Sequence, residues 1–380
     1  MKSFFTKALV VGVLISFIQP LYAQQDIEAG LQAIADEYRA VGLAVVVIKD
    51  NKPIYSKALG YKDLERKEPL ATDNLFRIAS ISKSFTATAI MQLVEQGKLS
   101  LGDDMSKLMG FTVRNPKFPD TPITLRMLLS HTSSINDSNG YFDLNVINPS
   151  KSTDWAKSYS DYAPGEGYAY CNLNFNMLGG MLERLTGKRF DNYIQETILQ
   201  PLGLAAGYCV DSLDNKRFAT LYEYKAQTND FSAQPAAYNP RTKDIENYVL
   251  GQSTPVFSPT GGLKISATDL ATYMQMHMNY GAYKDGKRLI TAESAKLMQT
   301  AVAVADGYGL ALSQSQQIIP GVTLVGHTGS AYGLYSTMFF NPEQKYGFIV
   351  VTNGCIADYE NDYVMLSVKA VNYLFKKLIE

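Results

Sequence analysis

The hydrophobic pattern of this 380-residue chain changes twice along its length, and this change constrains the fold more than any other feature. Residues 41–61 and 322–354 carry β-branched and aromatic residues in the runs and alternations typical of strands. Between them, residues 80–96, 172–187 and 266–281 carry apolar residues at helical spacing, each ending at or beside a glycine. Strands at both ends of the chain predict a single antiparallel sheet built from both termini.

We therefore expect an α+β fold in which an antiparallel sheet is flanked by terminal helices, near residues 27–39 and 358–379. The length suits two lobes. Residues 24–78 and 206–380 are expected to form an α/β lobe, and residues 79–205 an inserted, mainly helical lobe. An active site commonly forms in the cleft between two such lobes.

The first 23 residues have the pattern of an export signal. Two lysines precede an apolar run over residues 8–18, which is too short to span a bilayer comfortably, and residues 21–23 offer a small-residue cleavage site. We expect this segment to be removed, leaving a periplasmic or secreted protein with no stable membrane insertion. The alternative is a retained membrane anchor.

Composition argues against several function classes. The formal net charge of −1 gives no electrostatic reason to expect a nucleic acid or an anionic membrane as a partner. The three histidines lie far apart and have no metal-ligand spacing, so we expect neither a metal nor another cofactor. Cys171, Cys209 and Cys355 are odd in number and widely spaced, which does not indicate a disulfide framework, although an exported protein could bridge two of them.

The helical segment at residues 80–96 begins with a polar pair, Ser80 and Lys83. Positions i and i+3 lie on one helix face, so the lysine can reach the serine hydroxyl. Serine is a weak nucleophile until a base takes its proton, and burial or a helix N-terminus can lower the pKa of a lysine enough for that role. Taken alone, the pattern equally fits a helix-capping serine followed by a solvated lysine.

Two further short motifs combine residues that can bind or activate a substrate. In PGEGYAYCN, Tyr170 and Asn172 stand just before a helix, where the tyrosine could act as an acid or base and the asparagine could bind an amide. In GHTGSAYG, His327 and Thr328 offer hydrogen bonds, and Gly329 within a strand predicts the close approach of another chain or a ligand. The alternatives are a core tyrosine, a capping asparagine and an ordinary strand bulge.

Together the three motifs resemble those of the penicillin-recognising serine hydrolases, which include class C β-lactamases, DD-peptidases, D-aminopeptidases and related esterases. That family carries SxxK, YxN and then KTG or HxG, and this chain carries SISK, YCN and HTG in the same order. Other stretches look like the family as well, among them ITLRMLLSHTSS and SPTGGLKISATDLATYM. The resemblance covers nearly the whole chain after residue 23. It implies a mixed α/β lobe, an all-α lobe and an acyl-serine mechanism.

The resemblance also implies roles in catalysis. Ser80 is the implied nucleophile and Lys83 its activator, while Tyr170 shuttles protons and activates the water that removes the acyl group. How the lysine and the tyrosine divide the role of base is left open. The backbone N–H groups of Ser80 and Ser330 are the implied oxyanion hole.

The implied substrate-binding residues are Asn172 on the acyl side and His327, Thr328 and Gly329 on the opposite edge. Efficient β-lactamases of the family usually carry lysine where His327 stands, and a neutral imidazole should capture a carboxylate less well. We therefore expect a small-molecule ester, amide or peptide as the substrate. The alternatives are a β-lactamase, an acyltransferase that uses an alcohol or amine, and a non-catalytic binding or sensor protein.

Several neighbouring residues are expected to lie outside the chemistry. Ser82 and His131 are expected to be structural, and Ser84 to lie on the helix surface. Six aromatic residues in residues 222–257, together with Trp155, are hypothesised to border an apolar pocket for the acyl or leaving group. Ordinary packing between loops is the alternative.

Overall fold

The computed structural model describes residues 25–380, and the signal peptide expected at residues 1–23 lies outside them. Within this described range, no helix combines the length and the apolar character needed to cross a membrane.

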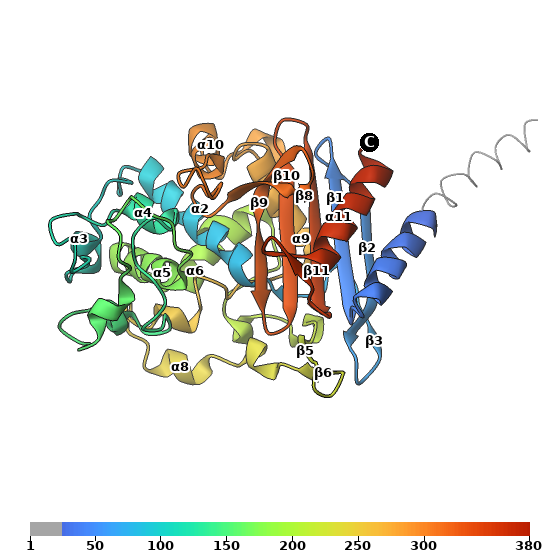
Figure 1. Ribbon diagram of the computed structural model, residues 1–380, viewed down its shortest axis with the longest axis horizontal. Helices are drawn as coiled ribbons and strands as arrows, with labels where there is room; N and C mark the ends of the chain where they lie inside the picture. Colours follow the sequence, from blue (N-terminus) through green and yellow to red (C-terminus); the bar gives the residue numbers. More distant parts are fainter. Residues whose placement is uncertain (1–24) are drawn as a thin grey trace, which may run out of the picture.

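A seven-stranded antiparallel sheet forms one side of the molecule (Figure 1). β1 (Gly42–Lys49) pairs with β11 (Tyr346–Gly354), so strands from the two ends of the chain meet inside the sheet. The expected sheet built from both termini is thereby confirmed. The strand order is β3-β2-β1-β11-β10-β9-β8, and the remaining strands are β2 (Lys52–Asp63), β3 (Glu68–Pro69), β8 (Ser313–Ile319), β9 (Val322–Ala331) and β10 (Leu334–Asn341).

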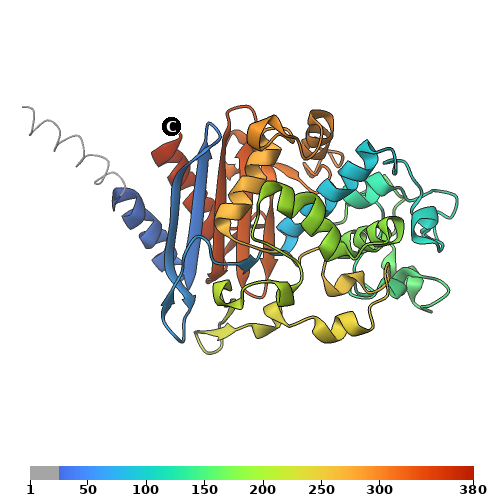
Figure 2. The same ribbon diagram turned by 180° about the vertical axis from the view of Figure 1, so that it is seen from behind.

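Both faces of this sheet are covered by helices. Successive side chains of a strand point to opposite faces. The odd-numbered residues from Leu43 to Val47 share a core with the helix at residues 25–37 and with α11 (Met365–Leu378). The even-numbered residues from Ala44 to Ile48 belong to a second core that includes α9 (Ala267–Met278). Figures 1 and 2 show the terminal helices on one face and α9 on the other.

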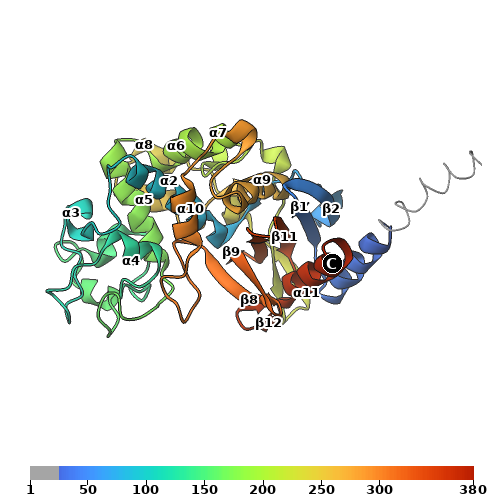
Figure 3. The same cartoon turned by 90° about the horizontal axis from the view of Figure 1, so that it is seen from above.

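The remaining helices gather beside the sheet, as the view from above shows (Figure 3). They are α2 (Ser82–Glu95), α3 (Met105–Met109), α4 (Leu125–Leu129), α5 (Asn172–Thr186), α6 (Phe190–Ile194), α7 (Gln200–Leu202), α8 (Thr242–Glu246) and α10 (Ala292–Gln299). Three short strand pairs complete the fold: β4 (Phe76–Arg77) with β7 (Lys264–Ile265), β5 (Tyr222–Lys225) with β6 (Asp230–Ala233), and β12 (Tyr359–Glu360) with β13 (Tyr363–Val364).

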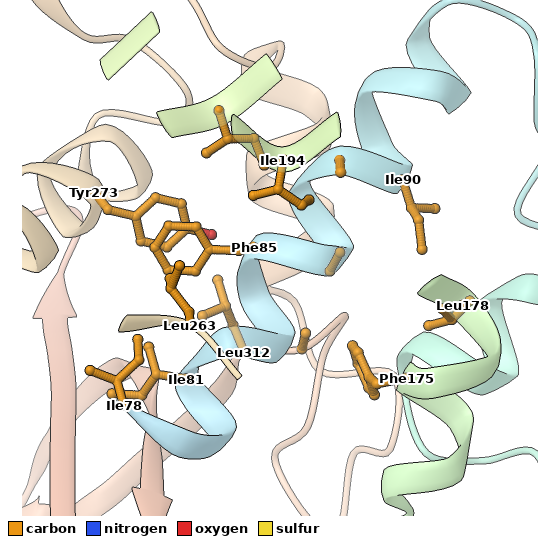
Figure 4. Close-up of a cluster of buried hydrophobic side chains, with 14 of the residues drawn as sticks. Ile78, Ile81, Phe85, Ile90, Phe175, Leu178, Ile194, Leu263, Tyr273 and Leu312 are labelled. Carbon is orange, nitrogen blue, oxygen red and sulfur yellow. The ribbon is translucent and has the colours of Figure 1, made fainter. Parts of the chain in front are cut away.

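Helix α2 runs through the centre of the larger core and is buried on nearly all sides. Its Phe85 stacks on Tyr273 of α9 with ring centroids 3.6 Å apart, while Phe175 of α5 lies on the other side of the helix (Figure 4). The expectation that Ser84 lies on the helix surface is wrong: the residue is fully buried, and its hydroxyl donates to the Ile81 carbonyl at 2.8 Å. A helix enclosed on all sides has no solvated face for a small polar residue to occupy.

Candidate active site

Ser80 lies in the 3-10 turn Ala79–Ile81 that leads into α2. Ala79 has φ of +51°, a left-handed conformation that costs a non-glycine residue on the order of 1 kcal/mol or more. The Ser82 hydroxyl holds the turn, because it donates to the Ala79 carbonyl at 2.6 Å and accepts the Leu263 N–H at 3.2 Å. Ser82 thus has the structural contacts expected of it, and Ser80 is left free to face a cavity.

Lys83 is fully buried one turn after Ser80. Its Nζ lies 3.0 Å from Ser80 Oγ, 2.9 Å from Asn172 Oδ1 and 3.0 Å from the Thr260 carbonyl. Burial lowers the pKa of Lys83 to about 7, although the nearby Asp137 acts in the opposite direction. A substantial fraction of this amine is therefore neutral near neutral pH and can accept the serine proton.

Asn172 is held in place by a carboxylate that the sequence did not single out. Asp137 Oδ2 accepts both the backbone N–H and the side-chain Nδ2–H of Asn172 at 2.9 Å, and Oδ1 accepts the Leu173 N–H at 2.9 Å. Asn172 Oδ1 is thereby turned toward Lys83, and it also accepts the Thr260 hydroxyl at 2.8 Å. Asp137 stands in a polar loop, and no local pattern distinguishes it from the other polar residues there.

Tyr170 covers the amine of Lys83. The centre of its ring lies 4.7 Å from Lys83 Nζ and 4.4 Å from the centre of the His131 ring. The residue is 39% exposed, yet burial of its hydroxyl raises the pKa of the phenol well above its ordinary value, and the Ser80 hydroxyl only partly opposes this. The phenol is therefore protonated at rest, which favours Lys83 over Tyr170 as the resting base.

The His131 ring packs against the Tyr170 ring. It is fully buried, and its Nδ1 accepts the Cys171 N–H at 3.1 Å. Burial lowers its pKa well below the ordinary value, so the ring is neutral. These contacts position the segment of Tyr170 and fit the expected structural role.

His327 is held as a neutral imidazole. Its Nδ1 lies 2.5 Å from the Thr328 carbonyl, which requires the proton on Nδ1, and its Nε2 therefore accepts from the Tyr308 hydroxyl at 3.0 Å. Burial lowers the pKa of His327 to about 4, helped by the nearby Lys83. Tyr308 is a further residue of the site that the sequence did not single out, and it packs against both His131 and Tyr170.

Gly329 allows β9 to approach the turn Ala79–Ile81, which contains Ser80. A Cβ at this position would stand 2.2 Å from the Ile78 carbonyl oxygen and 3.0 Å from the Ser80 nitrogen. β9 continues past the end of its pairing with β8 at Gly326, so residues 327–331 present an edge not paired with β8. The predicted close approach at this glycine is therefore present in the structure.

Two cavities meet at this point. The first, here named the Ser80 cavity, has a volume of about 590 Å³, and the second, the Asp306 cavity, about 880 Å³. Both are lined by Tyr170, His327 and Thr328. Lys83 lies behind Ser80, and the other residues of the predicted site all line the Ser80 cavity: Ser80, Tyr170, Asn172, His327, Thr328, Gly329 and Ser330.

Besides Tyr170 and His327, the aromatic side chains that line the Ser80 cavity are Tyr141, Phe142 and Tyr332. The hypothesis that the aromatic residues of residues 222–257 and Trp155 border the pocket is therefore wrong, since none of them lines either cavity. They serve packing instead: Tyr238 donates to the Ala219 carbonyl at 2.8 Å, and Trp155 packs edge-on against Tyr159.

No group of three or more His, Cys, Asp or Glu side chains in residues 25–380 is arranged to hold a metal ion. The three cysteines are all buried and unpaired.

Comparisons with known proteins identify the family to which this chain belongs. Protein flp of Staphylococcus aureus strain N315 is 25% identical over 348 residues, which are 87% of this chain and 63% of that protein, so the chain spans less than two thirds of this relative. The octameric penicillin-binding protein homologue from Pyrococcus abyssi superposes with a TM-score of 0.73 at 27% identity, covering 93% of this chain and 77% of the other.

The D-amino acid amidase from Ochrobactrum anthropi SV3, complexed with D-phenylalanine, shares the fold with a TM-score of 0.69 at 21% identity, over 93% of this chain and 99% of the amidase. The Beta-lactamase family profile matches residues 24–363, which is most of the chain. The protein accordingly belongs to the Beta-lactamase family, whose fold is shared by penicillin-binding proteins and serine hydrolases.

Proposed function

We propose that this protein is an exported serine hydrolase that cleaves an ester or a peptide-like amide through an acyl-enzyme on Ser80. The observation that carries the proposal is the distance of 3.0 Å between Ser80 Oγ and the buried amine of Lys83, whose pKa is lowered to about 7. A serine beside a partly neutral lysine, at the wall of a cavity, is the arrangement that nucleophilic catalysis requires. Export rests on the pattern of residues 1–23.

The first half-reaction forms the acyl-enzyme. Ser80 Oγ bonds to the substrate carbonyl carbon while neutral Lys83 takes the hydroxyl proton. The negative charge on the carbonyl oxygen is directed to the backbone N–H groups of Ser80 and Ser330. The C–O or C–N bond then breaks, and the proton passes to the leaving alcohol or amine, with Tyr170 placed to relay it.

The second half-reaction releases the acid. A water molecule gives a proton to the same base and bonds to the acyl carbon, after which the bond to Ser80 Oγ breaks and the proton returns to the serine. An alcohol or amine in place of water would give acyl transfer by the same steps, and water exclusion from the cavity decides between these outcomes.

The charges around the Asp306 cavity favour esters and amides over β-lactams. His327, which stands where a lysine would attract a β-lactam carboxylate, is neutral because its pKa is lowered to about 4. The same cavity is lined by Asp306 and Asp362, and no Lys or Arg of the described chain lines it. We assign the leaving group to the Asp306 cavity, because Asn172, which is implied on the acyl side, lines only the Ser80 cavity. A carboxylate on the leaving group would therefore meet negative charge without compensation.

The test is a comparison of kcat/KM for three substrates with the wild type and Ser80→Ala. We expect Ser80-dependent hydrolysis of 4-nitrophenyl hexanoate to exceed that of benzylpenicillin and of an N-acylated D-Ala-D-Ala peptide. Faster turnover of the penicillin would reverse the ranking in favour of a β-lactamase. Hydrolysis retained by Ser80→Ala would refute the acyl-enzyme.

A further inference from the structure

Arg77 is a buried cation in the wall of the Ser80 cavity. It belongs to β4 and stands three positions before Ser80 in the sequence. Its side chain is 5% exposed and lines the cavity together with Ser80 and Asn172. Among residues 25–380, no Asp or Glu lines this cavity, and Arg77 takes part in no salt bridge. Burial of a charge without a partner is unfavourable, so a buried arginine of this kind calls for an explanation.

The hydrogen bonds of Arg77 leave part of its guanidinium free for a ligand. Nε donates to the Gly261 carbonyl at 3.1 Å, and Nη1 reaches the Ala237 carbonyl at 3.4 Å. The Tyr332 ring covers one face of the guanidinium, with its centre 5.0 Å away. A guanidinium has five N–H donors, and these two protein acceptors use only two of them.

Two basic side chains lie near Arg77, and one of them, Arg241, adds positive charge to its surroundings. In the β4–β7 pair, Arg77 stands directly opposite Lys264, whose buried amine donates to the Tyr208 carbonyl at 2.7 Å and whose pKa is lowered well below its ordinary value by burial and by Arg77. Arg241 is a further cation close enough to act on Arg77. The positive charges of Arg77 and Arg241 repel each other, and an anion beside Arg77 would relieve this repulsion.

The two cavities consequently differ in charge. The Ser80 cavity contains Arg77 and no carboxylate, whereas the Asp306 cavity contains Asp306 and Asp362 and no Lys or Arg of the described chain. The nucleophile lies in the positively charged cavity, beside Asn172. A substrate whose acyl part carries an anion would match this distribution.

We propose that Arg77 determines specificity by binding a carboxylate on the acyl part of the substrate. This proposal rests on the proposed function and narrows it to acidic acyl groups. Carboxylates pair with guanidinium N–H groups in a planar, charge-assisted geometry. By the same reasoning, an acyl group with a free ammonium, as in a D-amino acid amide, is disfavoured beside Arg77.

The experiment compares two esters of equal acyl length, 4-nitrophenyl hydrogen adipate, which ends in a carboxylate, and 4-nitrophenyl hexanoate, which does not. We expect the wild-type kcat/KM to favour the adipate by about tenfold or more, the value of one hydrogen bond to a charged group. Arg77→Gln should reduce this ratio by about tenfold, and Arg77→Lys should retain part of it. An unchanged ratio in Arg77→Gln would overturn the proposal.

Lys264→Met is the matched control, because it replaces a buried basic side chain opposite Arg77, one whose pKa is lowered well below its ordinary value, without altering a residue that lines the Ser80 cavity. Its adipate-to-hexanoate ratio should match that of the wild type. Loss of the preference in Lys264→Met but not in Arg77→Gln would contradict the assignment.

If the Arg77 variants fail to fold, the salt dependence of kcat/KM, measured for the wild type with both esters, still tests the proposal. Rising ionic strength should lower kcat/KM for the adipate and leave that for the hexanoate nearly constant. Equal salt dependence for both esters would overturn the proposal. Failure of the proposed function looks different, since neither ester would then be hydrolysed in a Ser80-dependent way.

Discussion

The Asp137 carboxylate accepts both the backbone and the side-chain N–H of Asn172 at 2.9 Å, although the two residues are 35 positions apart. This double contact fixes the Asn172 amide so that its oxygen faces the amine of Lys83. The carboxylate also raises the pKa of Lys83 against the larger effect of burial. Asp137 therefore orients Asn172 beside Lys83 and partly offsets the lowering of the Lys83 pKa by burial.

Replacement of Asp137 by Asn should alter the pH dependence of hydrolysis. Without the carboxylate, the pKa of Lys83 falls further below about 7, so the neutral amine persists to lower pH. The acid limb of the kcat/KM profile for a neutral ester should move to lower pH. Loss of these charge-assisted hydrogen bonds should also reduce the free energy of unfolding by about 1–3 kcal/mol. An acid limb that stays in place or moves to higher pH would contradict this role.

Lys83→Met should abolish most activity, by about 10³-fold, because the general base is removed. The same variant tests the pKa of Lys83 through stability. The amine binds its proton with a pKa of about 7 in the folded protein and about 10.4 when unfolded, so the unfolded chain holds more protons between these values. Wild-type stability, relative to the variant, should therefore rise above about pH 7 by up to about 1.4 kcal/mol per pH unit.

Urea unfolding of the two proteins, measured at several pH values between neutrality and about pH 9, checks this. Parallel stability curves would mean that Lys83 keeps an ordinary pKa. That result would remove the argument for a neutral base.

His327→Lys should shift preference toward carboxylate-bearing substrates. The neutral imidazole would be replaced by a cation at the junction of the two cavities. The ratio of penicillin acylation to 4-nitrophenyl hexanoate hydrolysis should rise about tenfold. His327→Gln is the control, since it keeps a neutral polar side chain, and its ratio should stay near that of the wild type. A similar rise in both variants would indicate that the shape of the side chain at position 327, and not its charge, changes the substrate preference.

Gly329→Ala should impair catalysis more than folding. Its Cβ would stand 2.2 Å from the Ile78 carbonyl oxygen, which forces β9 away from the turn of Ser80. A displacement of this kind costs on the order of 100-fold in kcat. Gly102→Ala is the matched control, because its nearest neighbour, Ser100 Oγ, is 3.8 Å away, and its kcat should be unchanged. Equal kcat values for the two variants would show that the close approach is not needed.

The fold could be predicted from sequence because its signals are local. The apolar runs near residues 43–48 and 346–354 have the length and β-branched content of buried strands, and they pair in β1 and β11. The error at Ser84 has a similar origin. Helical periodicity predicts one buried face, whereas α2 has no charged residue between Lys83 and Glu95 and is enclosed by other helices.

The site could be predicted only where its residues form short motifs. Ser80 and Lys83 stand one turn apart on the chain, and Tyr170 and Asn172 are two positions apart. Three residues of the site stand outside any short motif: Asp137, Tyr308 and Arg77. The role of each depends on contacts with residues that are distant in the sequence. The Tyr308 hydroxyl, for example, meets His327 across 19 positions. Such contacts exist only once the tertiary structure is formed.

The central claim is that Ser80, activated by Lys83, carries the acyl group. The most direct measurement is intact-protein mass spectrometry with peptide mapping after reaction with a fluorophosphonate, for the wild type, Ser80→Ala and Lys83→Met. We expect one phosphonyl adduct on the peptide that contains Ser80 in the wild type, none in Ser80→Ala and much slower labelling in Lys83→Met. An adduct on another residue, or ester hydrolysis that survives in Ser80→Ala, would contradict it.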